Sequence, residues 1–187
     1  MIKNTSFKYG SLTKFLHWVI ALLIVVQFYL GLWSAWVLPK NSPELELYIV
    51  KLHEPIGILI FGLGALATLW MLANQHPLFP NSMRLWERII ARVAHILLYL
   101  ALLIMPITGI IMSMANGYPP NFFNLFQFPE WIEKNEDLAN LAFTFHKFIA
   151  YVFLALIILH ILAAFKHHFL NHDNVLKQML PGSNSEV

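Results

Sequence analysis

The chain has no cysteine among its 187 residues. This absence excludes disulfides, thiolate metal sites, iron–sulfur clusters and covalently attached c-type haem, because each of them requires a thiol. Charged side chains are also scarce, since they make up 12% of the chain against about 25% in soluble domains. The formal net charge is only +2, and we expect no nucleic-acid partner. The metal-binding side chains that remain are mainly the nine histidines.

Apolar residues, by contrast, are abundant. They make up 58% of the chain, and the mean hydropathy of +0.62 is typical of an integral membrane protein. Long apolar runs joined by short loops predict an all-α, up-down-up-down four-helix bundle, with a single domain over residues 1–187. The predicted transmembrane helices cover roughly residues 12–38, 47–72, 85–114 and 138–169.

The first apolar run follows two lysines and could also be a secretory signal peptide. Its apolar part is longer than the roughly 7–15 residues of a signal core, and no clear small-residue cleavage site follows it, so we expect a retained helix. The connection at 115–137 is rich in aromatic residues, as interfacial segments are. We expect part of it to lie flat on the membrane as a short helix.

The distribution of Lys and Arg predicts which side of the membrane each loop faces. Eight of them lie in the N-terminal segment, the second loop and the C-terminal flank, and four lie in or beside the first and third loops. Both termini are therefore expected in the cytoplasm, and the opposite side carries seven acidic residues. The eight are Lys3, Lys8, Lys14, Arg84, Arg88, Arg92, Lys166 and Lys177; the four are Lys40, Lys51, Lys134 and Lys147; the acidic seven are Glu44, Glu46, Glu54, Glu130, Glu133, Glu136 and Asp137.

The fourth predicted helix carries His146 and His160, fourteen residues apart. Fourteen steps of a helix return to within about 40° of the starting direction and rise about 21 Å. The two imidazoles therefore share one face, and their separation covers most of a hydrocarbon core about 30 Å thick. This spacing predicts two metal centres stacked across the membrane.

Histidines on two other helices lie at matching depths. His53 is near the non-cytoplasmic start of the second helix, level with His146, and His17 is near the cytoplasmic start of the first, level with His160. Two imidazoles facing each other across a bundle are typical of haem, whereas zinc and copper take three or four protein ligands at one point. The pairs His53–His146 and His17–His160 therefore favour two haem sites.

Small residues on these helices would leave room for a flat macrocycle. Gly31 lies fourteen residues after His17, and Gly57 and Gly64 share the face of His53. The alternative is that they are ordinary glycines of close helix packing, which membrane helices also favour.

His95 on the third helix is at a depth where it competes with His17 as the partner of His160, and the spacing alone leaves this choice open. Arg88 and Arg92 lie one and two turns nearer the cytoplasm and could pair with haem propionates. His95 would then form hydrogen bonds or contact a quinone beside them.

His167 and His168 follow Lys166 at the cytoplasmic end of the fourth helix. They could anchor the helix at the interface and interact favourably with its C-terminal dipole. Alternatively, they could exchange protons with a quinone at that surface, where a titration near neutral pH is useful.

Several segments together resemble the prokaryotic cytochrome b561 family. They are LTKFLHWVIALL around His17, LHEPIGILI around His53, RVAHILLYLALLIMPITGIIMSM on the third helix, FHKFIAYVFLALIILHILAAFKHHF on the fourth, and HDNVLKQMLPG near the end. The resemblance runs from about residue 8 to 182. It implies a four-helix cytochrome of the bacterial inner membrane.

The resemblance implies two non-covalent b haems with His17, His53, His146 and His160 as axial ligands, and it supports excluding His95 from the ligands. It also implies ubiquinone as an electron-exchange partner. Superoxide is then the expected small donor on the periplasmic side. Lys51 and Lys147 lie beside two of these histidines, but the acidic outer loops would not attract an anion from a distance.

Two other functions remain open at this stage. The protein could be a membrane-anchor subunit that passes electrons from a partner redox protein docked on the acidic face, without catalysis of its own. It could also be a non-redox metal or proton transporter, which would be colourless.

Overall fold

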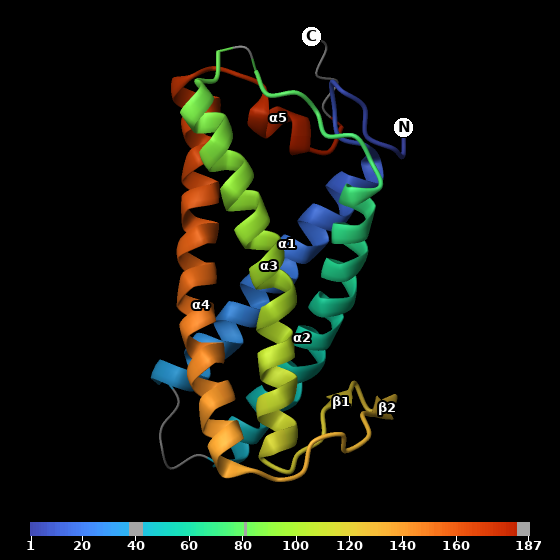
Figure 1. The fold of residues 1–187 in the computed structure, drawn as a ribbon, viewed down its shortest axis with the longest axis vertical. Helices are drawn as coiled ribbons and strands as arrows, with labels where there is room; N and C mark the ends of the chain where they lie inside the picture. The colour runs from blue at the N-terminus through green and yellow to red at the C-terminus, as the bar shows by residue number, and fades with distance from the viewer. Residues whose placement is uncertain (38–42, 81, 183–187) are drawn as a thin grey trace.

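The computed structural model describes residues 1–37, 43–80 and 82–182, and within them the chain is mostly helical (Figure 1). Four helices in this part are long and apolar enough to cross a membrane, which confirms the predicted all-α bundle. Their candidate spans are Ser11–Trp36, Tyr48–Leu72, Leu85–Ala115 and Glu136–Leu170. In chain order the elements are α1 (Ser11–Leu32), the π-helix η1 (Trp33–Val37), α2 (Pro43–Leu72), α3 (Leu85–Ala115), β1 (Asn121–Phe122), β2 (Phe126–Gln127), α4 (Glu136–Phe165), the π-helix η2 (Lys166–Leu170) and α5 (Val175–Met179).

The helix ends differ from the predicted ones by a few residues. α2 begins at Pro43 rather than near Leu47, because proline fits the first turn of a helix, where its missing N–H costs nothing. α4 begins before the expected Leu138, because the Oδ1 of Asn135 accepts a hydrogen bond from the Leu138 N–H at 2.9 Å and caps the helix. The predicted end of the first helix at Leu38 lies outside the described residues.

The connection between α3 and α4 contains a hairpin, and the expected short surface helix was wrong. β1 and β2 pair antiparallel, with Phe122 opposite Phe126. At the turn, Phe123 and Asn124 have φ angles of 49° and 58°, which a right-handed helix cannot contain. The Oδ1 of Asn121 accepts a hydrogen bond from the Asn124 N–H at 2.6 Å, so the asparagines favour the turn over a helix.

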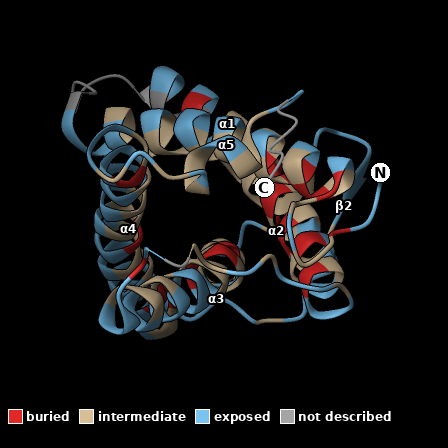
Figure 2. Cartoon of the chain, turned by 90° about the horizontal axis from the view of Figure 1, so that it is seen from above, coloured by how far each residue is buried: buried red, intermediate tan, exposed pale blue. Residues whose placement is uncertain are grey.

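The helices do not all pack on one another to the same extent. α3 packs along α4, α1 along α2 and α2 along α3, whereas α4 makes only sparse contacts with α1 and α2. A view from above shows buried positions on helix sides that face the other helices (Figure 2). The buried core cluster is made of Leu16, Ile20, Ile60, Ala67, Ala101, Leu102 and Phe153.

The N-terminal segment and α5 lie at one end of the bundle, and the β1–β2 hairpin lies at the other (Figure 1). We refer to these as the terminal end and the hairpin end. At the terminal end α5 is fastened to α1, because the Trp18 Nε1–H donates to the Met179 carbonyl at 2.8 Å and the Lys14 ammonium donates to the Leu180 carbonyl at 2.9 Å.

Candidate metal centres

Two pairs of histidines face each other between helices. Towards the hairpin end, His53 of α2 and His146 of α4 have ring centroids 6.2 Å apart, with their planes at 69°. Towards the terminal end, His17 of α1 and His160 of α4 have ring centroids 6.3 Å apart, with their planes at 52°. The structure thus brings together the residues that the sequence placed at matching depths.

The separation of the rings indicates what lies between them. A metal–imidazole bond is about 2.0 Å long and a ring centroid is about 1.2 Å from its nitrogen, so two imidazoles on opposite sides of one metal have centroids about 6.4 Å apart. Rings joined directly by an N–H···N hydrogen bond of about 2.9 Å would have centroids only about 5.3 Å apart. The separations of 6.2 and 6.3 Å therefore fit a metal ion held between the two imidazoles of each pair.

His95 of α3 has a different geometry. Its ring centroid is 5.3 Å from that of His160, which is too close for a metal between opposed rings. Its Nδ1 lies 2.6 Å from the carbonyl oxygen of Ala91, so that nitrogen donates within its own helix. The ring separations therefore favour His17 over His95 as the partner of His160.

Two of the facing imidazoles have a buried nitrogen without a partner. Within the described ranges, the Nδ1 atoms of His17 and His53 have no hydrogen-bond partner although they are shielded from solvent. A buried polar atom left unpaired costs about 1–3 kcal/mol, so such atoms usually mark a missing ligand or group. Both histidine pairs contain one such atom, as expected of sites that hold a further group.

Glycines border the rings of the pair near the hairpin end. A Cβ atom on Gly31 would lie 3.4 Å from His53 Cε1, and one on Gly109 would lie 3.2 Å from His146 Cε1. Any larger side chain at these positions would press on the imidazoles. The first of these glycines was expected at this level from its position fourteen residues after His17.

Gly57 and Gly64 serve helix packing instead of bordering the rings. A Cβ on Gly64 would lie 2.8 Å from the Leu102 side chain, and one on Gly57 would lie 3.0 Å from the amide nitrogen of Gln27. That amide nitrogen donates to the His53 carbonyl at 2.9 Å and so joins α1 to α2. For these two glycines the close-packing alternative is the one that their contacts support.

The donor set fits haem better than a compact metal site. In the part of the chain that the structure describes, no group of three or more His, Cys, Asp or Glu side chains could hold a metal ion. Each pair instead offers two opposed imidazoles, and α4 packs only sparsely against the two helices that face it. Two opposed imidazoles are a ligand set that a haem takes in a helical bundle.

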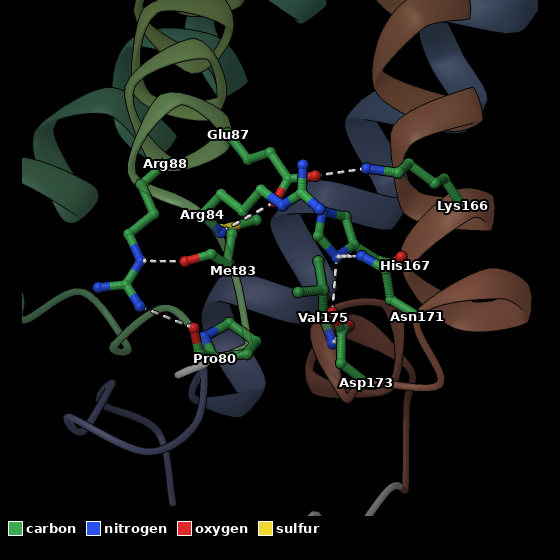
Figure 3. Close-up of polar contacts among 10 residues, drawn as sticks. All are labelled: Pro80, Met83, Arg84, Glu87, Arg88, Lys166, His167, Asn171, Asp173 and Val175. Carbon is green, nitrogen blue, oxygen red and sulfur yellow. Dashed lines mark hydrogen bonds and ion pairs between the residues drawn. The ribbon is translucent and has the colours of Figure 1, made fainter.

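Arg88 and Arg92 bind the connection that precedes α3. The Arg88 guanidinium donates from Nε to the Met83 carbonyl and from Nη2 to the Pro80 carbonyl, both at 3.0 Å (Figure 3). The Arg92 guanidinium lies 5.6 Å from the centre of the Phe79 ring. These contacts hold the connection against α3, and they give both arginines a role other than pairing with propionates.

His167 and His168 lie where η2 ends the fourth span. The His167 ring is buried, and its Nδ1 lies 2.6 Å from the Asp173 carboxylate and 3.2 Å from the Asn171 amide nitrogen (Figure 3). The neighbouring Lys166 forms an ion pair with Glu87 of α3. His168 has a buried Nδ1 without a partner among the described residues. His167 thus joins the C-terminal segment to the end of the fourth span.

Thr108 and Gly109 lie beside His146 and were not among the site residues expected from the sequence. The hydroxyl oxygen of Thr108 on α3 lies 2.9 Å from His146 Nδ1, and Gly109 follows it beside the same ring. The available signal was a threonine and a glycine just after Pro106 in an apolar helix, at a position that helix packing would bring against α4.

Glu54 is a further residue of this region. Its carboxylate lies 2.7 Å from the Ser113 hydroxyl and accepts a hydrogen bond from the Asn121 N–H at 3.2 Å. It therefore fastens β1 and the end of α3 to the helix turn that carries His53.

The comparisons with known proteins agree over nearly the whole chain. Residues 8–182 match the family model of prokaryotic cytochrome b561. The chain is 32% identical to Cytochrome b561 homolog 2 of Escherichia coli (strain K12), over 98% of this chain and 96% of that protein. It is 29% identical to the Probable superoxide oxidase CybB of Yersinia pestis, over 93% of this chain and 96% of that protein. It is 26% identical to Cytochrome b561 homolog 1 of Escherichia coli (strain K12), over 93% of this chain and 97% of that protein. The chain therefore belongs to the prokaryotic cytochrome b561 family of haem b-binding, electron-transferring bacterial membrane proteins.

Proposed function

We propose that this protein holds two b haems and passes electrons from a donor at the hairpin end to ubiquinone near the terminal end. His53 and His146 are the axial ligands of one haem, and His17 and His160 are those of the other. The observation that carries the proposal is the separation of the two pairs, 6.2 and 6.3 Å, at two depths of one bundle.

When bound, each haem supplies a reversible one-electron couple at its iron. Two histidines of the chain would hold each haem, which would leave no open position for oxygen and would favour electron transfer. His146 and His160 stand on the same helix, about 21 Å apart in rise. α4 therefore keeps the two sites at a constant spacing that covers most of the membrane.

The charge distribution supports a direction across the membrane. The excess of Lys and Arg in the termini and the second loop favours the cytoplasm for the terminal end. The hairpin end then faces the periplasm of a bacterial inner membrane. In this orientation His53 and His146 serve the donor, and His17 and His160 serve the quinone.

Superoxide is the donor that we propose. One relative is named a probable superoxide oxidase, and the exposed Lys51 and Lys147 lie near His53 and His146 in the sequence. The acidic residues of the hairpin end oppose long-range attraction of an anion, so the lysines would act only at short range. The balanced reaction is two superoxide anions plus one ubiquinone plus two protons giving two dioxygen molecules and one ubiquinol.

The acidic surface favours a second candidate function. Glu130 and Glu133 are exposed in the connection at the hairpin end, next to the exposed Glu136 and Asp137 at the start of α4. A basic redox protein could dock there and deliver electrons, and this chain would then be an electron-transferring anchor without its own catalysis. Ubiquinone reduction by the purified protein with superoxide alone would exclude that role.

One stopped-flow experiment on the purified protein distinguishes the two functions. A reduced-minus-oxidised spectrum first establishes the haem content, and a colourless protein would instead support a non-redox transporter. Superoxide is then added with and without ubiquinone. We expect rapid haem reduction, followed by reoxidation only when the quinone is present. Haems that stay oxidised would contradict the superoxide donor while leaving the cytochrome assignment intact.

A further inference from the structure

Thr108 of α3 joins its own helix to His146 of α4 through one hydroxyl group. Its Oγ1 is 2.7 Å from the carbonyl oxygen of Met105, one turn earlier, and 2.9 Å from His146 Nδ1. α3 and α4 have the most extensive contact of any helix pair that the structure describes, so both distances are held by a well-packed interface.

These two contacts determine where the protons lie. A carbonyl oxygen only accepts, so the single hydroxyl proton of Thr108 is donated to Met105. The hydroxyl oxygen can then interact with His146 Nδ1 only by accepting a proton from it. The neutral imidazole therefore carries its proton on Nδ1, and the lone pair is on Nε2, the nitrogen left for a metal.

Gly109 restricts the same ring from the side. A Cβ at this position would lie 3.2 Å from Cε1 and 3.5 Å from Nδ1 of His146, so the ring rests against backbone. The His146 ring is thus oriented both by a hydrogen bond and by contact with backbone.

We propose that Thr108 is a positioning residue that sets the tautomer, orientation and basicity of His146, and thereby the reduction potential of the haem at the hairpin end. This inference rests on the proposed function. A hydrogen bond from the distal ring nitrogen makes a histidine a more basic ligand, which favours the oxidised metal. Loss of the hydroxyl therefore raises the potential of that haem alone.

The experiment is a potentiometric titration of the purified holoprotein, with electron paramagnetic resonance spectra of its oxidised state. Thr108→Val removes the hydroxyl and keeps the shape, Thr108→Ala removes it without added bulk, and Thr108→Ser restores it. Thr68→Val is the matched control, because Thr68 is also half-buried and its hydroxyl donates only within its own helix, to Gly64 at 2.7 Å.

We expect Thr108→Val and Thr108→Ala to shift the redox equilibrium of one haem three- to tenfold towards the reduced form, tenfold being 59 mV for one electron. Its resonance spectrum should change as well. The other haem should titrate unchanged, Thr108→Ser should resemble the wild type, and Thr68→Val should have no effect. Selective loss of one haem in Thr108→Val that Thr108→Ser restores would also support the proposal.

Wild-type titrations and spectra in both Val and Ala variants would overturn the role of Thr108 while the proposed function stood. Equal shifts of both haems, or a shift in Thr68→Val as large as in Thr108→Val, would overturn it too. A wild-type protein without haem would instead contradict the proposed function itself.

Discussion

The imidazole of His17 faces that of His160 with ring centroids 6.3 Å apart, although few backbone positions of α1 and α4 come close to each other. Helices that pack directly have axes about 8–10 Å apart and interlocking side chains. Here α1 and α4 approach each other through facing rings: the centroids of His17 and His160 are 6.3 Å apart, and those of Phe28 and Phe153 are 5.8 Å apart. A group bound between the two imidazoles would join the first and last spans of the bundle.

Removal of haem should therefore loosen the protein as well as decolourise it. A ligand present at a thousand times its Kd stabilises the folded state by about 4 kcal/mol, and each haem also relieves one unpaired buried nitrogen. We expect a lower Tm and faster hydrogen exchange in α1 and α4 when the protein is produced under haem limitation. Equal stability of haem-free and haem-loaded protein would contradict this reasoning.

Substitution of His17 and His95 should separate their roles. His17→Ala should lower the haem content from two per chain to one, because it removes an axial ligand. His95→Ala should retain both haems, because its ring is 5.3 Å from His160, too close for a shared metal. A pyridine haemochrome assay gives the content directly. Loss of a haem in His95→Ala and not in His17→Ala would reverse the assignment.

Gly31 should not accept a large side chain. A Cβ on Gly31 would already lie 3.4 Å from His53 Cε1, and the methyl groups of a valine would come closer. We therefore expect Gly31→Val to displace the imidazole and abolish one haem. Gly62→Val is the matched control on α2, since a Cβ there would meet nothing within 4 Å. The expected result is a haem content near one for the first variant and two for the second. A content of two in both variants would show that the ring tolerates the added bulk.

Glu54→Ala should release the hairpin from the bundle. The substitution removes the acceptor of the Asn121 N–H and the partner of the Ser113 hydroxyl, and hydrogen bonds to a charged group contribute about 1.5–3 kcal/mol. Amides of residues 121–128 should exchange roughly tenfold faster or more, with no change at the terminal end. Glu44→Ala, exposed on the same helix, serves as the control. Unchanged exchange in the hairpin would mean that other contacts hold it.

Asp173→Ala should weaken the C-terminal segment. Its carboxylate lies 2.6 Å from the buried His167 Nδ1 and accepts a hydrogen bond from the Val175 N–H at 3.1 Å, at the start of α5. Loss of both contacts should cost about 1–3 kcal/mol and speed the exchange of amides at 174–180. Asp137→Ala, at the opposite end of the bundle, should leave those amides unchanged. Equal protection in both variants would contradict the anchoring role of His167.

The local pattern of the chain was enough to predict the helices. Long apolar runs must form helices in a bilayer, because each backbone group has to find its partner within the segment. The fourteen-residue spacing of His146 and His160 likewise depends only on helix geometry. By contrast, the hairpin at 121–127 depends on two residues with positive φ angles and on side-chain hydrogen bonds at its turn. The aromatic content of this segment, on which the predicted surface helix was based, carries no information about either.

The sequence by itself determined the number of spans, the depth of each histidine and the side of the bundle on which each charge lies, because these follow from composition and periodicity. Periodicity left His17 and His95 open as partners of His160, and the family resemblance favoured His17; only the tertiary structure supplied the two ring separations, 6.3 and 5.3 Å, which favour it as well. It also decided that Thr108 meets His146, that Arg88 binds Met83 and Pro80, and that Gly64 packs on Leu102. Each of these depends on how one helix is rotated against another, and that rotation is set by packing over the whole interface.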